Sequence, residues 1–468
     1  MRATAPFPSS SAGPAGPDPS GVNPEPERYQ ALGPKHLDHI ARRFGLSREL
    51  VDAVRVFSAV LPFRVNDYVL TELIDWDRVP ADPIFQLVFP QPGMLDADDQ
   101  RTVRAALTRG ATRQELEEVV RPIRARLNPH PAGQTDLNVP FDTDGPVRGL
   151  QHKYDRTVLF FPSQGQTCHA YCTYCFRWAQ FVGDADLRFA APGVERLVAW
   201  LGEHPEVTDV LVTGGDPMIM SGENLRRHLL PLLDVETVRT IRIGTKAVAY
   251  WPQRFTSDHD ADDTLRLFEQ VVASGRTLAV MAHLSHPAEL APAVARAGLR
   301  RVRDTGAVLY GQAPLVGRVN DDADTWHDLW TAELAAGVVP YYLFVTRDTG
   351  PREYFEVPLA RAVEIFRSAY NRLPGLARTV RGPVMSTTPG KVLVDGVEGE
   401  GEGRRFALLF VQARDPALVG RPFRARWSAH ASWYTHLELD PGTPPDIAAA
   451  FPARPVLAGE SPLAAAAR

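Results

Sequence analysis

The three cysteines of the chain, Cys168, Cys172 and Cys175, all lie within one eight-residue stretch. Their spacing is C-x3-C-x2-C, and the sequence around them reads TCHAYCTYCFRW. Three thiolates so close together can face one point only if the loop wraps around it, which suits a metal ion or an iron–sulfur cluster. Three cysteines would leave one iron of a four-iron cubane without a protein ligand, and we expect chemistry to occur at that open iron.

Two other interpretations of these cysteines stay open. A structural zinc site is one, because Cys3His is a known zinc ligand set and His169 is adjacent. Zinc sites usually combine two separated ligand pairs, whereas these ligands form a single group. Three buried structural thiols are the other alternative. An odd number of cysteines argues against a secreted disulfide framework, since one thiol would be left over.

Composition narrows the class of protein. The 468 residues are 44% hydrophobic and 23% charged, which is ordinary for a globular protein with a large core. With 51 basic and 56 acidic residues, the sequence has no electrostatic signature of binding to nucleic acid or to an anionic membrane. The sequence also lacks a long apolar run and the apolar segment of a signal peptide, so we expect a cytoplasmic protein.

The elements that must position the cysteines are short β-branched segments that alternate with amphipathic helices. The six expected strands begin at Thr157, Asp209, Thr240, Thr277, Ala307 and Val339. Strict alternation of strand and helix predicts an α/β fold with parallel strands joined by right-handed crossovers. Six units fall short of the eight of a closed barrel, which predicts a partial barrel or an open sheet. Ligands then bind at the carboxyl ends of the strands, and the cysteines directly follow the first one.

The remainder of the chain divides by texture into further regions. We expect a disordered leader at 1–27, a helical region at 28–145, the βα region at 146–373, a β-rich extension at 374–440 and a flexible tail at 441–468. Within the helical region, the proline-rich segment 79–94 predicts an extended connector without regular structure.

The cysteine motif and the six βα units together resemble the radical S-adenosylmethionine (SAM) superfamily. The segments DVLVTGGDPM, TIRIGTKAVAYWPQRFT, AHLSHPAEL, GAVLYGQAPLVGRVND and VPYYLF are similar, in this order, to lysine 2,3-aminomutase and its relatives. The resemblance runs from about Leu61 to Gly399. It implies a partial (β/α)6 barrel and a [4Fe-4S] cluster on Cys168, Cys172 and Cys175. It also implies that the open iron binds SAM, which is cleaved to methionine and a 5'-deoxyadenosyl radical that abstracts hydrogen from the substrate.

The resemblance further implies a set of SAM-binding residues: Tyr174, Gly214, Gly215, Asp216, Lys246 and Gln312. The two glycines would allow close backbone approach at a strand end, and Asp216 would accept a hydrogen bond from the ammonium of SAM. A plain turn before a helix is the alternative for this segment. Gln312 matches a position that contacts the adenosyl group in the family, or else is a buried glutamine paired with backbone.

For the substrate, the implied residues are Arg177, His283, Arg347 and Arg381. Arg177 falls where the aminomutases place an arginine that binds the substrate carboxylate, and a guanidinium suits that role because it can bind both oxygens. His283 and His286 match a histidine pair of the family, or are core histidines. Arg347 stands near the position of an acid that holds the distal ammonium of lysine, so it would suit an anion on the substrate instead.

The second cofactor of the aminomutases, pyridoxal phosphate (PLP), is expected to be missing. Arg381 occupies the position of the lysine that binds PLP, and arginine stays protonated and forms no imine. The chain contains only four lysines, Lys35, Lys153, Lys246 and Lys391, and Lys246 is the best substitute. The first alternative function is therefore a PLP-dependent amino acid 2,3-aminomutase with an atypical PLP site. The second is a non-catalytic zinc-binding module.

The expected partners follow from the same interpretation. We expect a small amino-acid-like substrate that carries a carboxylate, and an electron donor such as flavodoxin or ferredoxin. We expect no nucleic acid and no membrane partner. The aminomutases associate through terminal extensions, and an altered extension follows Leu373 in this chain, so we also expect a homodimer.

Overall fold

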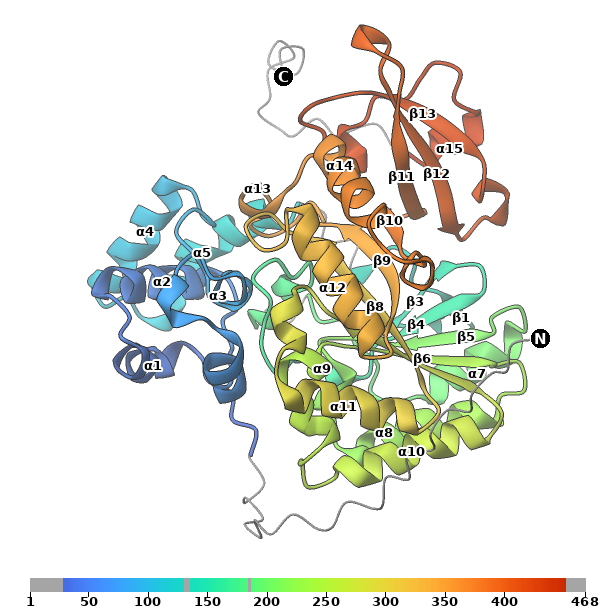
Figure 1. Ribbon diagram of the computed structural model, residues 1–468. Coiled ribbons are helices and arrows are strands. Elements are labelled where there is room, and N and C mark those ends of the chain that lie inside the picture. Colours follow the sequence, from blue (N-terminus) through green and yellow to red (C-terminus); the bar gives the residue numbers. More distant parts are fainter. Residues whose placement is uncertain (1–27, 130–134, 184–186, 452–468) are drawn as a thin grey trace, which may run out of the picture.

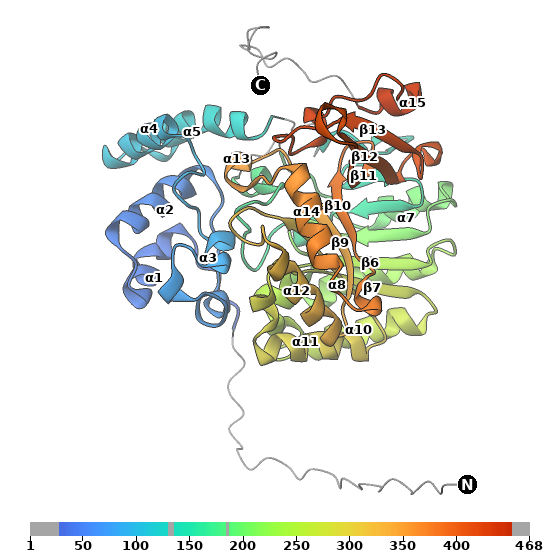
Figure 2. The ribbon, with the colours of Figure 1, turned by 45° about the horizontal axis from the view of Figure 1, so that its top comes forward.

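A computed structural model of the chain describes residues 28–129, 135–183 and 187–451. The expected leader at 1–27 lies outside these residues. Three parts follow one another in space (Figure 1). They are the N-terminal helices, a large sheet with helices packed on it, and the C-terminal strands. The second view shows the N-terminal helices beside the sheet and the C-terminal strands at its far edge (Figure 2).

One sheet of eleven strands runs through the molecule, in the order β13-β12-β11-β10-β9-β8-β7-β6-β5-β4-β3. From β4 to β10 the strands are parallel, whereas β3 pairs with β4, and β10 to β13 pair with one another, in antiparallel register. The strands are β3 (Leu150–Tyr154), β4 (Thr157–Phe160), β5 (Asp209–Val212), β6 (Thr240–Thr245), β7 (Thr277–His283), β8 (Val308–Leu315), β9 (Val339–Val345), β10 (Arg381–Ser386), β11 (Gly390–Glu398), β12 (Arg405–Ala413) and β13 (Pro422–Arg426). A separate two-residue hairpin joins β1 (Phe141–Asp142) and β2 (Gly145–Pro146).

The six strands expected from the sequence are present and neighbour one another in chain order, which confirms the α/β class and its parallel sheet. The sequence did not predict that a seventh parallel strand, β10, follows them. It pairs with β9 through Arg381 opposite Tyr342 and Val384 opposite Phe344, with a register shift between. The parallel sheet therefore extends past the expected boundary at residue 373.

Helices cover one face of the parallel strands (Figure 1). They are α7 (Glu195–Glu203), α8 (Gly222–Leu229), α9 (Ala247–Tyr250), α10 (Ala261–Ala273), α11 (Ala293–Asp304), α12 (Ala323–Ala335), α13 (Arg352–Phe355) and α14 (Leu359–Tyr370). In β6 and β8, buried residues alternate with half-buried ones, as expected for a sheet packed against helices on one face and less crowded on the other. No helix among the described residues is both long and apolar enough to cross a membrane.

The N-terminal region is helical, as expected, and shares the main hydrophobic core with the sheet. Its helices are α1 (Leu37–Phe44), α2 (Arg48–Val60), α3 (Pro83–Val88), α4 (Ala97–Thr108) and α5 (Arg113–Leu127). The predicted extended connector at 79–94 is wrong in its middle, where α3 forms. Asp82 caps this helix by accepting from the Phe85 N–H, and Pro83 occupies the first turn, where its missing N–H costs nothing.

The C-terminal strands pack around a second core, to which the short helix α15 (Pro445–Ala449) contributes Ile447. The expected flexible tail at 441–468 thus begins with residues that pack on the sheet, because Ile447 and Phe451 bury apolar surface there. The remainder of that tail, 452–468, lies outside the described residues.

The sheet curves so that its first strand approaches the C-terminal strands. Lys153 on β3 donates from Nζ to Oγ of Ser386, the last residue of β10, at 3.2 Å. Beside it, the N–H of Asp155 donates to the carbonyl of Ala413 on β12, and Arg414 donates from Nε to the carbonyl of His152. Residues that are more than 200 positions apart in the chain are therefore neighbours at this seam.

One buried carboxyl group of the helical layer gives a stability prediction. Glu333 on α12 is 1% exposed, and its Oε2 has no hydrogen-bond partner in the described part of the chain. It packs against Gly311 on β8, where a Cβ would lie 2.4 Å from the carboxylate. Burial raises the pKa of Glu333 well above its ordinary value, and the nearby Glu289 raises it further. The folded state therefore keeps this proton to a higher pH than the unfolded state does.

Stability should accordingly fall as the pH rises above the unfolded pKa of Glu333. We expect Glu333→Gln to increase the free energy of unfolding at pH 8 by about 1–3 kcal/mol, the usual cost of an unsatisfied buried polar group, and by less at pH 5. Urea unfolding at the two pH values measures this. Glu269→Gln, at an exposed position of α10, is the matched control and should change neither value. Equal destabilisation by Glu333→Gln at both pH values would contradict the prediction.

Candidate active site

The cysteine loop, residues 166–177, follows β4 and the 3-10 helix Ser163–Gly165 and leads into the 3-10 helix Trp178–Phe181. The N-terminal region holds it in place. The N–H of Tyr171 donates to the carbonyl of Arg64 at 2.9 Å, and the N–H of Thr173 donates to the carbonyl of Leu87 at 2.8 Å. Asn66, fully buried, donates from Nδ2 to the carbonyl of His169 at 3.2 Å. The sequence did not predict this role of the helical region.

The turn after β5 packs on the segment that precedes Cys168. Gly214 has a φ of +156°, and a Cβ on Gly215 would lie 2.5 Å from the backbone N and O of Thr167. The N–H of Asp216 donates to the carbonyl of Thr167 at 2.7 Å and to that of Gly165 at 3.1 Å. The two glycines therefore serve a close approach of chain to chain, which fixes where the cysteine loop begins.

Asp216, which the sequence predicts to contact SAM, is also bonded to the chain itself. Its side chain is buried, and Oδ1 accepts from the Met218 N–H at 2.9 Å and from Oγ1 of Thr245 at 2.7 Å. Oδ2 accepts from the Lys246 N–H at 2.8 Å. Burial raises the pKa of Asp216 to about 6, although these hydrogen bonds oppose the shift. The carboxylate therefore fastens the end of β5 to the end of β6.

The three cysteines are half-buried. Burial of the sulfur atoms raises the pKa of all three, to about 12 for Cys175. The other two thiols also act to raise the pKa of Cys168, and the Cys172 thiol acts to raise that of Cys175. Each thiol also has a cation close enough to lower its pKa: Arg64 for Cys168, Lys246 for Cys172 and Arg177 for Cys175. Three thiolates with a cation each are a donor set that fits a cluster carrying negative charge.

The described residues include no group of three or more His, Cys, Asp and Glu side chains that could hold a metal ion. His169 packs edge-on against Tyr29, at 5.0 Å between ring centroids, and its Nδ1 is buried without a hydrogen-bond partner in the described part of the chain. Burial lowers the pKa of His169 to about 3. The Cys3His zinc set is thus not assembled. In a cubane, by contrast, each cysteine binds a different iron, so the sulfur atoms need not converge on one ion.

A hydrogen-bonded network joins the cysteine loop to the ends of β6 and β7. Tyr174 OH lies 2.8 Å from Nε2 of His283 and 3.3 Å from Oγ of Ser285. Lys246 donates from Nζ to the same Ser285 Oγ at 3.1 Å and to Oε1 of Glu289 at 2.7 Å. Glu289 has no exposed surface, and the sequence did not identify it. Tyr174, His283 and Lys246, expected at the site, are therefore brought together.

Gln312 lies beside this network, because it pairs in register with His283 of β7. Its side chain is half-buried on the less crowded face of β8. His286 is not part of the site: its Nδ1 accepts from the Ala288 N–H at 3.2 Å and caps a short 3-10 helix. Burial lowers the pKa of His283 well below its ordinary value, and Lys246 lowers it further, so this imidazole is neutral.

Two of the expected substrate arginines flank one aromatic ring. The guanidinium carbons of Arg347 and Arg177 lie 4.6 Å and 5.8 Å from the ring centroid of Phe176. Arg177 is buried and lies 4.0 Å over Phe161, and its hydrogen bond to Gln180 Oε1 is 3.4 Å long. No described carboxylate forms an ion pair with either arginine. Burial lowers the pKa of Arg177 to about 10, with Arg347 acting in the same direction.

Arg381 opens β10 and is exposed, away from the pair around Phe176. Its side chain forms no hydrogen bond or ion pair with the described residues, although it lies near enough to Tyr342 to lower the pKa of that phenol. The structure thus groups Arg177 with Arg347, and leaves Arg381 by itself on the neighbouring strand.

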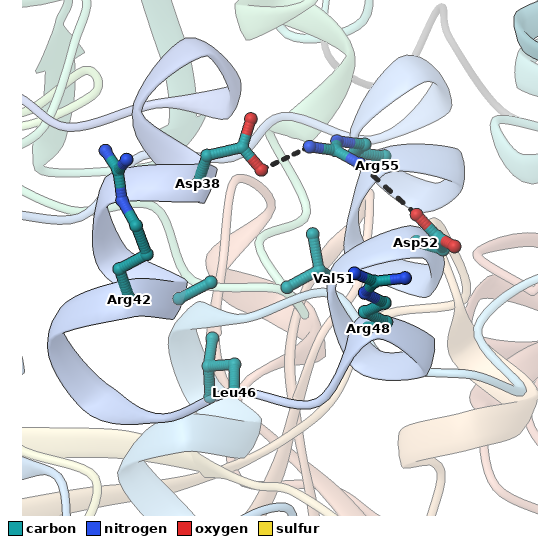
Figure 3. Close-up of a pocket in the computed structure, with 8 residues that line it drawn as sticks. Asp38, Arg42, Leu46, Arg48, Val51, Asp52 and Arg55 are labelled. Atoms are coloured by element: carbon teal, nitrogen blue, oxygen red, sulfur yellow. Dashed lines mark hydrogen bonds and ion pairs between the residues drawn. The ribbon is translucent and has the colours of Figure 1, made fainter.

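A surface depression of about 540 Å³ lies elsewhere, between α1 and α2 (Figure 3). Arg55 spans it, paired with Asp38 on α1 and with Asp52 on its own helix. None of the residues expected at the active site lines this depression. It is a feature of the N-terminal helices alone.

Comparison with known proteins gives the family. No protein-family model matches the chain. A protein of Aquifex aeolicus named "Putative L-lysine 2,3-aminomutase" is 31% identical over 390 residues, which cover 83% of this chain and 89% of that protein. The L-lysine 2,3-aminomutase of Clostridium subterminale is 29% identical over 243 residues, or 51% of this chain and 55% of that enzyme. A radical SAM methyltransferase from Sphaerobacter thermophilus aligns with 76% of this chain and 94% of its own, at 16% identity and a TM-score of only 0.32, too low to inform the fold.

The long match to the Aquifex protein includes the cysteine loop, the turn that supports it and the parallel strands that carry both. Thus the chain belongs to the lysine 2,3-aminomutase-like family of the radical SAM superfamily.

Proposed function

We propose that this chain is a radical SAM enzyme that acts on an amino-acid-like substrate carrying a carboxylate, without PLP, within a partial (β/α)6 barrel. Cys168, Cys172 and Cys175 would hold a [4Fe-4S] cluster. When bound, the cluster and SAM supply a 5'-deoxyadenosyl radical that abstracts hydrogen. The chain itself binds the substrate, orients it and excludes water.

The observation that carries this proposal is the position of the three thiols at the carboxyl end of β4. They lie next to the turn at Gly215 and close to Arg177, which forms no ion pair with a described carboxylate, and Arg347 lies across Phe176 from Arg177. A buried guanidinium without a carboxylate is costly, and an anionic ligand would offset that cost. Arg177 follows Cys175 by two positions, so a carboxylate held there lies beside the cluster loop.

The residues do not fit covalent binding of PLP at Arg381 or at Lys246. Arg381 cannot form an imine, and Lys246 is ion-paired with Glu289 at 2.7 Å. The paired ammonium would have to lose its proton and leave a buried carboxylate alone. We therefore propose a reaction in which the radical acts on the substrate without PLP.

The further partners belong to the same proposal. Reductive cleavage of SAM needs one electron, and we propose a small donor protein such as flavodoxin or ferredoxin. We also propose a homodimer, as in the aminomutases that the sequence resembles.

The test is reconstitution under anaerobic conditions with iron and sulfide, followed by SAM and dithionite. We expect about four irons per chain, a cluster signal in the absorption and electron paramagnetic resonance (EPR) spectra, and release of 5'-deoxyadenosine. Cys172→Ala should lose all three. His169→Gln should keep the iron, whereas a Cys3His zinc site would lose its metal on that substitution. Zinc without iron, or a cluster that never yields 5'-deoxyadenosine, would refute the proposal.

A hydroxyl next to the cysteine loop leads to a prediction about the cluster's potential. Tyr250 OH lies 3.7 Å from Sγ of Cys172, and Tyr250 is fully buried. Once Cys172 is a thiolate ligand it has no proton, so only the tyrosine can donate. Hydrogen bonds to ligand sulfurs raise the reduction potential of an iron–sulfur cluster because they stabilise the more negative, reduced state.

We expect Tyr250→Phe to keep the iron content and to shift the reduction potential to a more negative value. A redox titration followed by EPR measures the shift. Tyr171→Phe is the control, because the Tyr171 hydroxyl bonds to Oγ1 of Thr167 at 2.9 Å and to no sulfur. Equal potentials for wild type and Tyr250→Phe would show that the hydroxyl does not act on the cluster.

A further inference from the structure

Two of the four lysines are buried side by side at the seam where β3 meets the C-terminal strands. Lys153 on β3 is 5% exposed and Lys391 on β11 is 8% exposed. Their Nζ atoms lie 5.6 Å and 4.4 Å from the ring centroid of Tyr154, which both share. Lys391 also lies 5.0 Å from the ring of Tyr342 on β9. Residues far apart in the sequence thus place two ammonium groups on one tyrosine.

Arg347 adds a third cation to this group. It donates from Nη2 to the carbonyl of Ser386 at 2.6 Å, and Lys153 donates from Nζ to Oγ of the same serine at 3.2 Å. Lys391 donates from Nζ to Oε1 of Gln412 at 2.6 Å. We call Lys153, Arg347 and Lys391 the seam cations. The acceptor in each of these three hydrogen bonds is a neutral oxygen.

No carboxylate of the described residues lies within ion-pair distance of a seam cation. The acid that acts on Lys391, Asp209, is already paired with Arg242, at 2.7 Å between Nη2 and Oδ2. Asp348 follows Arg347 in the chain and raises the pKa of its guanidinium. Three cations are therefore held together against their mutual repulsion and against the cost of burial.

The protonation of these groups reflects that cost. Burial lowers the pKa of Lys153 well below its ordinary value, and Arg347 and Lys391 lower it further. Burial lowers the pKa of Lys391 to about 7, with Arg242 acting in the same direction. The pKa of Arg347 is also lowered by burial. The three seam cations contribute little to the stability of the free protein. Binding of a ligand of opposite charge would explain why they lie together.

We propose that the seam cations form a binding site for a dianionic group carried by the substrate, either a phosphate ester or a second pair of carboxylates. Arg347 links this site to Arg177 across Phe176. A substrate could thus place its α-carboxylate at Arg177 and its dianionic group at the seam. A substrate with a cationic side chain, such as free lysine, does not suit the seam, because the seam cations would repel it. The inference that the substrate carries this dianionic group rests on the proposed function. The inference that the seam cations bind an anion does not.

The test is titration of the anaerobically reconstituted full-length protein with inorganic phosphate and, separately, with malonate. Isothermal calorimetry at constant ionic strength, with chloride as the balancing anion, measures the affinity. We expect saturable binding of at least one of the two probes, and the stronger one indicates phosphate ester or dicarboxylate. Lys153→Met and Lys391→Met should each weaken it at least tenfold. Lys35→Met, at an exposed position of the N-terminal region, is the control and should bind like wild type.

A second measurement separates loss of the site from loss of the fold. Without added anion, Lys153→Met should melt at the same or a higher temperature than wild type, because it removes a buried amine whose protonation Arg347 and Lys391 oppose. Phosphate or malonate should raise the melting temperature of wild type and of Lys35→Met, and not that of Lys153→Met. A lower melting temperature of Lys153→Met without anion, together with unchanged anion affinity, would mean that the lysine is structural and would overturn the proposal.

PLP provides the remaining outcome. A PLP absorption band that disappears in Lys391→Met or Lys153→Met would assign the seam to a cofactor and overturn the substrate proposal. Phosphate binding in a protein that releases no 5'-deoxyadenosine would refute the proposed function and leave the anion site standing. Release of 5'-deoxyadenosine with no anion binding would refute the anion site and leave the proposed function standing.

Discussion

Gly215→Ala is expected to give a folded protein that no longer holds a complete iron–sulfur cluster. The added Cβ would lie 2.5 Å from the backbone N and O of Thr167 and 2.7 Å from its carbonyl carbon. These are backbone atoms, which cannot rotate away as a long side chain can. The segment must move instead, and the next residue is Cys168, one of the three proposed cluster ligands.

The expected size of the effect follows from how sensitive ligand geometry is to such a shift. Overpacking of this kind costs about 1–3 kcal/mol of stability, which a domain of this size tolerates. A displacement of about 1 Å at a reacting group can cost about a hundredfold in rate. We therefore expect a modest decrease in melting temperature, a large loss of bound iron and at least a hundredfold slower release of 5'-deoxyadenosine.

Gly244→Ala is the matched control for this experiment. Gly244 lies on β6, and the atom nearest to an added Cβ there is Oγ1 of Thr213 at 3.6 Å, an ordinary contact. The control should retain its iron. If Gly215→Ala also kept a full cluster and normal turnover, the packing of the turn on Thr167 would not determine the position of the loop.

Lys246→Met is expected to be the most destabilising single substitution at the site. The ammonium of Lys246 forms a 2.7 Å ion pair with Glu289, and the two side chains are 9% and 0% exposed. Removal of one member of a buried pair leaves the other charge without compensation, which typically costs about 3–5 kcal/mol. Glu289 also accepts from the Ser285 N–H at 2.6 Å, so the loop after β7 should loosen as well.

A double-mutant cycle separates this charge effect from simple loss of packing. Adding Glu289→Gln to Lys246→Met should recover part of the lost free energy of unfolding, because no unpaired carboxylate remains. Lys246→Arg can keep the pair and should unfold close to wild type. Urea denaturation provides all the values. If Lys246→Met and Glu289→Gln were simply additive, the ion pair would contribute nothing to stability.

Asp216 is a residue with a structural role that the sequence did not reveal. The sequence places it at a strand end after two glycines, where an acid can either bind a ligand or cap the chain. An aspartate can serve in either role, so the residue type does not distinguish them. Only the positions of Thr245 and of the Lys246 N–H, which come from the next strand, decide that the carboxylate is engaged by the chain.

The N-terminal region gives a second example. Its helical character was predictable from apolar spacing, because spacing within one helix is a local property, although α3 was not predicted. The contacts by which this region holds the cysteine loop were not predictable. The hydrogen bonds from Tyr171 to Arg64 and from Thr173 to Leu87 join backbone groups. Backbone donors and acceptors are identical along the chain, so no pattern of side chains reveals which of them will pair.

What the sequence by itself determined is what depends on residue identity and short-range period. It determined the three thiols in one loop, the alternation of strand and helix, and the arginine at position 381 that cannot bind PLP. What only the tertiary structure decided is which distant residues meet. Lys153, Arg347 and Lys391 come together because the sheet curves until β3 reaches β10 and β11. Sheet curvature is the sum of many small twists, which the spacing of residues along one strand does not encode.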